Sequence, residues 1–167
     1  MNYAKIDKVS VADGIGVRTV LYVSGCSLHC KGCHNPECWN RSFGKPFTED
    51  TMQEILLTLT KPYISRFTLS GGHPLDPQNA PKVLEIVKRV KMVFPNKDIW
   101  IYSGYEWENI IKDKTLREIL KYIDVLVDGA YIDELRDISL AFRGSSNQRI
   151  IDVPKSLEQN KVILWQE

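Results

Sequence analysis

Three of the four cysteines in this 167-residue chain lie close together in the segment "CSLHCKGCHN" at residues 26–35. Their spacing is C-x3-C-x2-C, which places Cys26, Cys30 and Cys33 on one short stretch. Thiolates this close in sequence bind soft metals such as zinc or the irons of an iron–sulfur cluster. The spacing therefore predicts a metal centre at this segment.

Two kinds of metal centre fit these thiols. A [4Fe–4S] cluster held by three cysteines leaves its fourth iron open to a substrate, whereas fully ligated clusters take four cysteines. A structural zinc site needs four ligands, and Cys38 would complete one, with His29 and His34 as further candidates. The apolar stretch directly before the segment, and a glycine pair after the next apolar stretch, favour the cluster because a zinc site needs neither.

The composition argues against several partners and locations. Lys and Arg (22) nearly balance Asp and Glu (21), so the net charge of +1 creates no strong field toward nucleic acid or an anionic membrane. No apolar run approaches the roughly 18 residues that cross a bilayer. The first ten residues lack the pattern of a signal peptide. We expect a cytoplasmic chain with reduced thiols and with no nucleic-acid or membrane partner.

Short β-rich stretches alternate with helical patterns, and we expect a single domain over residues 1–167. The β-rich stretches are residues 17–25, 65–72, 97–104 and 124–131, with two more candidates at 148–153 and 161–166. The helical patterns cover residues 48–61 with Thr48 as N-cap, 77–94, and 105–123 as one helix or a pair. The predicted fold class is α/β, with a mainly parallel sheet and flanking helices. Periodicity does not separate an open sheet from an incomplete barrel.

Chemistry-bearing residues follow four of the predicted strands. Cys26 follows the first strand, Gly71 and Gly72 the second, Ser103 the third and Asp128 the fourth. The carboxyl ends of parallel strands share one rim, and ligands of α/β folds bind there. We therefore expect these residues to converge on one site.

Together, the cysteine motif and the "SGG" at residues 70–72 resemble the radical S-adenosylmethionine enzymes. Longer stretches narrow the resemblance to the activating proteins of anaerobic ribonucleoside-triphosphate reductase. These stretches are "CKGCHNPECWN" (30–40), "TLSGGHPL" (68–75), "LVDGAY" (126–131) and "FRGSSNQRIID" (142–152). The resemblance runs from Asp13 to Asp152 and implies an incomplete (β/α) barrel of the radical S-adenosylmethionine type.

The resemblance also implies two cofactors. One [4Fe–4S] cluster per chain would be held by Cys26, Cys30 and Cys33, and S-adenosyl-L-methionine would bind at its open iron. No catalytic side chain beyond the cluster ligands is implied. The cofactor-contacting residues that we predict are Gly32, Cys33, His34, Ser70, Gly71, Gly72, Ser103 and Asp128.

These cofactor contacts differ in kind. Backbone around Gly32 should line the adenosyl side, and the glycine pair should present main chain to the methionine ammonium, because glycine lets a backbone approach a ligand closely. Ser103 is assigned to the methionine carboxylate and Asp128 to the ribose hydroxyls. These last two assignments depend on rim position, and a turn-forming role for Asp128 before Gly129 remains an alternative.

One residue departs from the family pattern. After the two glycines these proteins usually carry an acid, and this chain carries His73. An acid can accept hydrogen bonds from the ammonium, whereas a neutral histidine accepts through one ring nitrogen only. We therefore hypothesise that backbone carbonyls hold the ammonium and that S-adenosylmethionine binds more weakly or with more pH dependence.

The implied activity is that of an activating enzyme, an oxidoreductase that cleaves S-adenosylmethionine reductively and generates a glycyl radical. Its partner would be the large subunit of the reductase, at a glycine near the C-terminus, with an electron donor of the flavodoxin type. One alternative is an activase of another glycyl radical enzyme, such as pyruvate formate-lyase. The other is a non-catalytic, zinc-stabilised binding module. "RGSSNQR" (143–149) could bind a carboxylate of the cofactor, dock the partner or cap the sheet edge.

Overall fold

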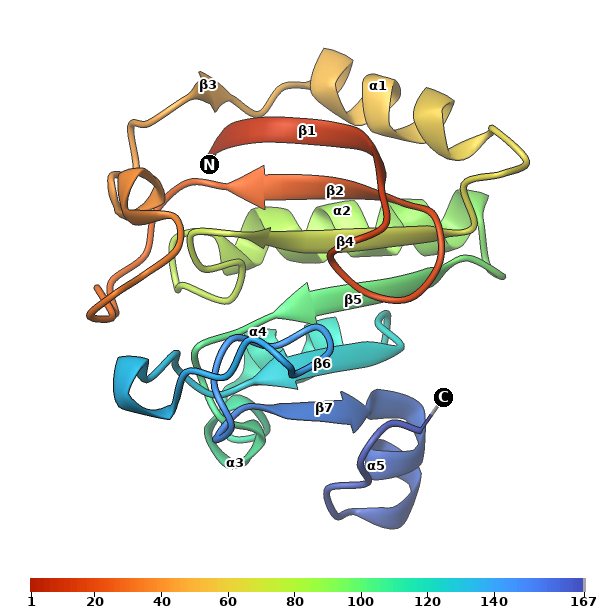
Figure 1. The fold of residues 1–167 in the computed structure, drawn as a ribbon. Coiled ribbons are helices and arrows are strands. Elements are labelled where there is room, and N and C mark those ends of the chain that lie inside the picture. Colours follow the sequence, from red (N-terminus) through yellow and green to blue (C-terminus); the bar gives the residue numbers. More distant parts are fainter. Residues whose placement is uncertain (167) are drawn as a thin grey trace.

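The computed structural model describes residues 1–166, whose strands form one sheet of seven in the order β3-β1-β2-β4-β5-β6-β7 (Figure 1). All of the strands predicted from the sequence are present except the last. The strands are β1 (Asn2–Ser10), β2 (Arg18–Val23), β3 (Lys45–Pro46), β4 (Arg66–Gly71), β5 (Asp98–Tyr102), β6 (Val125–Asp128) and β7 (Arg149–Asp152). Residues 161–166 form only an isolated bridge between Leu164 and Ile151, so the prediction of a strand there is wrong.

The predicted helical stretches are confirmed, and residues 105–123 form a pair of helices. The helices are η1 (Pro36–Trp39), α1 (Glu49–Leu59), α2 (Ala80–Val93), α3 (Trp107–Ile110), α4 (Lys114–Leu120), η2 (Asp133–Leu135) and α5 (Val153–Gln159). Thr48 caps α1 as predicted, because its side chain accepts from the backbone N–H of Thr51 while the Thr51 side chain accepts from the Thr48 N–H. Asp113 caps α4 in the same position.

The prediction of a mainly parallel sheet in an incomplete barrel is wrong, because the sheet is mixed. Strands β2, β4, β5 and β6 run parallel, but β1 pairs antiparallel with β2 and β3, and β7 pairs antiparallel with β6. A parallel neighbour needs a crossover connection, usually a helix. Neither the loop 11–17 between β1 and β2 nor the segment 129–148 between β6 and β7 contains an α-helix.

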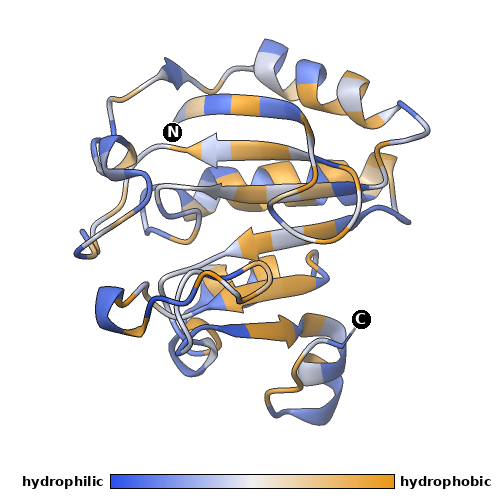
Figure 2. Ribbon diagram, viewed as in Figure 1, coloured by the Kyte–Doolittle hydropathy of each residue, from blue (hydrophilic) through white to orange (hydrophobic). Residues whose placement is uncertain are grey.

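Apolar side chains fill both faces of the sheet. Alternate residues of β5 separate the two: Ile99 and Ile101 join the large core under α1, α2 and α4, whereas Trp100 joins a smaller cluster on the other face. Figure 2 shows hydrophobic residues on the central strands and on the helices, interspersed with paler and polar ones. In the described part of the chain, no helix combines the length and the hydropathy required to cross a bilayer. The single domain over 1–167 remains a prediction.

Candidate functional site

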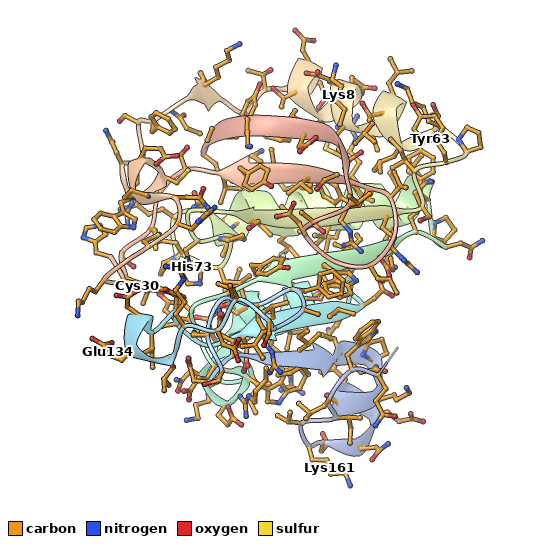
Figure 3. The ribbon with its side chains drawn as sticks, viewed as in Figure 1. Lys8, Cys30, Tyr63, His73, Glu134 and Lys161 are labelled. Atoms are coloured by element: carbon orange, nitrogen blue, oxygen red, sulfur yellow. The ribbon has the colours of Figure 1, made fainter. Side chains whose placement is uncertain are left out.

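A cavity of about 510 Å³ opens at the carboxyl ends of the parallel strands. Figure 3 places Cys30, His73 and Glu134 at this same end of the sheet. Four segments surround the cavity: the cysteine loop after β2, the glycine pair at the end of β4, residues 102–104 at the end of β5, and the segment 129–148 between β6 and β7. The predicted site residues that line it are Cys26, Cys30, Gly32, Cys33, His34, Ser70, Gly71, Gly72 and Ser103.

The three motif cysteines share this cavity and interact with one another. Cys26 is buried, and Cys30 and Cys33 are half-buried. Burial raises the pKa of the Cys30 thiol, and the neighbouring Cys26 and Cys33 raise it further. Soft sulfur donors that repel each other as thiolates are the kind of set that bound metal cations stabilise. In residues 1–166, no three Cys, His, Asp or Glu side chains are arranged around a single shared ion position.

The fourth cysteine has a different environment. Cys38 lies in η1 and is 2% exposed, and it is not among the residues that line the cavity. Burial raises the pKa of its thiol to about 11, with Glu37 adding to the effect, so the group stays protonated at neutral pH. Its backbone carbonyl accepts a hydrogen bond of 2.8 Å from the Gly25 N–H. Cys38 thus stabilises the start of the cysteine loop through its backbone and from outside the cavity.

The glycine pair is required by the close approach of two backbones. Gly71 has φ +97°, and a Cβ there would lie 2.7 Å from the Val23 carbonyl oxygen. A Cβ on Gly72 would lie 2.7 Å from the Gly25 carbonyl oxygen. The end of β4 therefore packs directly against the end of β2 and the start of the cysteine loop, which only glycine permits.

Asn79 joins the two loops, although the sequence did not single it out. This residue precedes α2 and is 3% exposed. Its side-chain amide donates to the carbonyl oxygens of Ser24 (3.1 Å), Gly25 (3.2 Å) and His73 (3.0 Å). The first two acceptors come immediately before Cys26, and the third follows the glycine pair. One buried amide thus fixes the cysteine loop relative to the loop after β4.

His73 is buried between three elements. It is 1% exposed, its backbone N–H donates to the Gly25 carbonyl at 2.9 Å, and its Nε2 lies 3.1 Å from Ser103 Oγ. The ring packs edge-on against Tyr105 with centroids 4.4 Å apart. Burial lowers the pKa of His73 to about 4, against an opposing effect of Asp76. With a pKa this low the ring is neutral from about pH 6 to 8, and weaker or more pH-dependent binding of S-adenosylmethionine remains a prediction from the sequence.

Asp128 is the one predicted cofactor contact that does not line the cavity. Its buried carboxylate accepts from Arg149 Nε at 3.0 Å and Nη2 at 2.6 Å, and from the Trp107 N–H at 2.8 Å. These bonds tie β6 to β7 and to the start of α3. The structure thus gives this side chain protein partners, and contact with the ribose remains only a prediction from the sequence.

The segment 129–148 contributes cavity residues that the sequence did not indicate. Arg136, Ile138 and Leu140, in the middle of this segment, line the cavity. Its base is held by "RGSSNQR", where the Gln148 side chain accepts from the N–H groups of Gly144 (2.9 Å) and Ser145 (3.2 Å). One signal in the sequence could have indicated these residues: the connection between the two strands is long and has no helical pattern, and such long loops are often functional.

Comparison with known proteins is consistent with this geometry. The family described as "4Fe-4S single cluster domain" matches residues 12–151. Relatives named anaerobic ribonucleoside-triphosphate reductase-activating protein come from Enterobacteria phage T4 (45% identical over 150 residues) and Haemophilus influenzae (45% over 152). They cover 90% of this chain in both cases, and 93% and 97% of the relatives. The protein of that name from Escherichia coli K12 is 41% identical over 150 residues, 89% of this chain and 96% of the relative.

The chain belongs to this family of activating proteins. The resemblance stated from the sequence is thereby confirmed, and so is a domain of the 4Fe-4S type. The matched region 12–151 contains the cysteine loop, the glycine pair and the whole of the segment 129–148. The individual roles of the lining residues remain predictions.

We predict that Asn79→Ala lowers the free energy of unfolding by about 1–3 kcal/mol, because three buried carbonyls lose a donor. Urea unfolding under anaerobic conditions measures this change, and iron analysis after reconstitution shows whether the variant retains less iron than wild type. Gln78→Ala is the matched control, since Gln78 is exposed and adjacent. Equal stability of the two variants would contradict the assignment of Asn79 as the tie between the loops.

The lowered pKa of His73 predicts acid sensitivity of the fold. Unfolded His73 binds its proton near pH 6.5 and folded His73 only near pH 4, so the unfolded state holds more protons between these values. Stability should therefore fall by up to about 3 kcal/mol as pH decreases from 6.5 to 4. Comparing wild type with His73→Gln at each pH isolates this contribution, because glutamine does not titrate. Parallel pH profiles of the two proteins would show that the prediction is wrong.

Proposed function

We propose that this chain activates anaerobic ribonucleoside-triphosphate reductase by radical chemistry at a [4Fe–4S] cluster held by Cys26, Cys30 and Cys33. The observation that carries the proposal is the shared cavity, which these three cysteines line together with the glycine pair and Ser103. Family membership supports it, because the relatives are named as activating proteins of this reductase. In this proposal the chain is an oxidoreductase that acts on another protein.

The residues present fit the two cofactors. Three cysteines of one loop that line the same cavity suit a cluster with an open iron, and a cavity of about 510 Å³ falls within the usual range for small-molecule sites. When bound, the cluster and S-adenosyl-L-methionine supply a reductive cleavage to methionine and a 5′-deoxyadenosyl radical, which takes a hydrogen atom from a glycine of the partner. The low potential of this step calls for an external electron donor, for which we propose a flavodoxin-type protein.

The chain contributes ligation, orientation and shelter from water. The cysteine loop and the loop after β4 are held together by Asn79, so the thiolates and the glycine backbone keep a fixed relation. Backbone at Gly71 and Gly72 lies against the cavity without side chains, where it suits the methionine ammonium. Gly32 and His34, on the cysteine loop, suit the adenosyl side. Apolar Leu28 and Leu140 line the cavity and exclude water from the reacting groups.

For the partner we propose the glycine-bearing segment near the C-terminus of the large reductase subunit, reached through the cavity mouth. The names of the relatives favour the reductase over pyruvate formate-lyase as the target. A zinc-stabilised module would need a fourth ligand such as Cys38, and that buried side chain lies outside the cavity lining. The four cysteines, all within the described residues, form no disulfide with one another, which supports our proposal of a cytoplasmic location.

The first test concerns the ligands. After anaerobic reconstitution, wild type should carry about four irons, as the cluster formula requires, and show a reduced-cluster EPR signal that shifts with S-adenosylmethionine. Cys26→Ser, Cys30→Ser and Cys33→Ser should each lose most of the iron and the signal. Cys38→Ser is the matched control and should keep both. Zinc in place of iron, with Cys38 essential, would establish the zinc-stabilised module instead.

The second test concerns the target. Reduced protein with S-adenosylmethionine should produce a glycyl-radical EPR doublet on the large subunit of anaerobic ribonucleoside-triphosphate reductase, with methionine released. Replacing the glycine near the C-terminus of that subunit by alanine should abolish the doublet, because the glycine Cα that would carry the radical is then absent. Pyruvate formate-lyase serves as the comparison substrate. A doublet on that enzyme and none on the reductase would overturn the assigned target.

A further inference from the structure

Ser103 has an unusual hydrogen-bond environment at the cavity wall. Its Oγ accepts from the Tyr105 N–H at 2.9 Å and lies 3.1 Å from His73 Nε2. The residue is 5% exposed and lines the cavity. A serine hydroxyl has two acceptor positions and one proton to donate. The direction of the bond to His73 therefore decides what Ser103 can offer to a ligand.

The unpartnered nitrogen of His73 indicates that direction. Nδ1 is buried and has no hydrogen-bond partner among the described residues. The neutral ring carries one proton, and placing it on Nδ1 would bury an N–H without an acceptor, which is the rarer kind of orphan in proteins. We assign the proton to Nε2, which then donates to Ser103 Oγ. With the Tyr105 N–H as the second donor, both acceptor positions of the hydroxyl are occupied.

We propose that His73 is a positioning residue that leaves Ser103 with its proton free to donate into the cavity, toward the carboxylate of the methionine moiety. This inference depends on the proposed function, since it assumes that S-adenosylmethionine occupies the cavity. Ser103 follows β5, and the glycine pair lies at the end of the adjacent β4, where Gly71 is the last residue. Ammonium and carboxylate share one carbon, so an ammonium on the glycine backbone brings the carboxylate close to the neighbouring strand.

An acid at position 73 would reverse this arrangement. An ionised carboxylate only accepts hydrogen bonds. The Ser103 hydroxyl would therefore donate its hydrogen bond to that carboxylate and would no longer donate into the cavity. The histidine therefore changes what the rim recognises: the acid of the family pattern can serve the ammonium, whereas His73 prepares a donor for the carboxylate. The low pKa of His73 is consistent with this role, because the ring stays neutral and keeps one proton.

The test compares two ligands that differ only in the carboxylate. Dissociation constants of S-adenosylmethionine and decarboxylated S-adenosylmethionine are measured by anaerobic equilibrium dialysis on reconstituted wild type, His73→Gln, His73→Glu, Ser103→Ala and the His73→Glu/Ser103→Ala double variant. Gln and Glu have nearly the same shape, but only Gln can donate as Nε2–H does. Iron content and circular dichroism establish that each variant is folded and loaded.

We expect wild type and His73→Gln to prefer the carboxylate-bearing ligand, and Ser103→Ala and His73→Glu each to lose roughly tenfold of that preference. The double variant should lose no more than Ser103→Ala alone, because His73 acts through Ser103. A general loss of structure would weaken both ligands equally and leave the ratio unchanged.

Several outcomes would overturn the assignment. If Ser103→Ala leaves the ratio of the two dissociation constants unchanged, Ser103 is not the donor to the carboxylate. That variant is decisive even if His73→Glu fails to fold. A loss in His73→Gln as large as in His73→Glu, or multiplied losses in the double variant, would exclude action through the Nε2–Ser103 bond. If wild type binds neither ligand, the proposed function fails as well, whereas normal binding with an insensitive ratio overturns this inference alone.

Discussion

The geometry of the site depends on one buried amide. Asn79 stands at the start of α2 and holds carbonyl groups from the cysteine loop and from the loop after β4. Helix α2 is itself fixed, because Val83, Ile86 and Val87 are buried in the main core. Core packing is thus transmitted through one side chain to the backbone beside Cys26. A loop without regular structure gains the precision of a helix in this way, which ligands of a reactive centre require.

The parallel centre of the sheet could be predicted because the connections that lead to β4, β5 and β6 each contain a stretch with helical periodicity. The antiparallel edges could not. β1 carries Lys5, Asp7 and Lys8, a polar pattern that gives little sign of a strand, and it forms because its backbone pairs with β2 and β3. The direction of β7 is set by its pairing with β6 across residues 129–148, a long-range contact that no local periodicity records.

The residues of the site also differ in whether the sequence could predict their positions. Cys26, the glycine pair and Ser103 could be placed from the sequence because each follows a parallel strand, and parallel strands end at one rim. Asp128 satisfies the same rule, yet its carboxylate is occupied by Arg149 from the antiparallel β7. Asn79 gave no signal, since an asparagine before a helix is ordinary. Position after a strand predicts proximity, but the partner of a polar side chain depends on tertiary pairing.

In the proposed function the cavity must exclude water and also admit part of another protein, and the segment 129–148 bears on both demands. Its base is rigid: the side chain of Gln148 holds two backbone N–H groups, and Arg143 donates to the Gln148 carbonyl at 2.7 Å. Its outer part is held lightly, by an ion pair of Lys31 and Glu134 at 2.8 Å whose side chains are both mostly exposed. Such surface pairs contribute about 0–1 kcal/mol, so the contact can be exchanged for another at little cost. Ile138, at the tip, is 90% exposed although it lines the cavity, so the same segment that covers the site offers an apolar contact at its mouth.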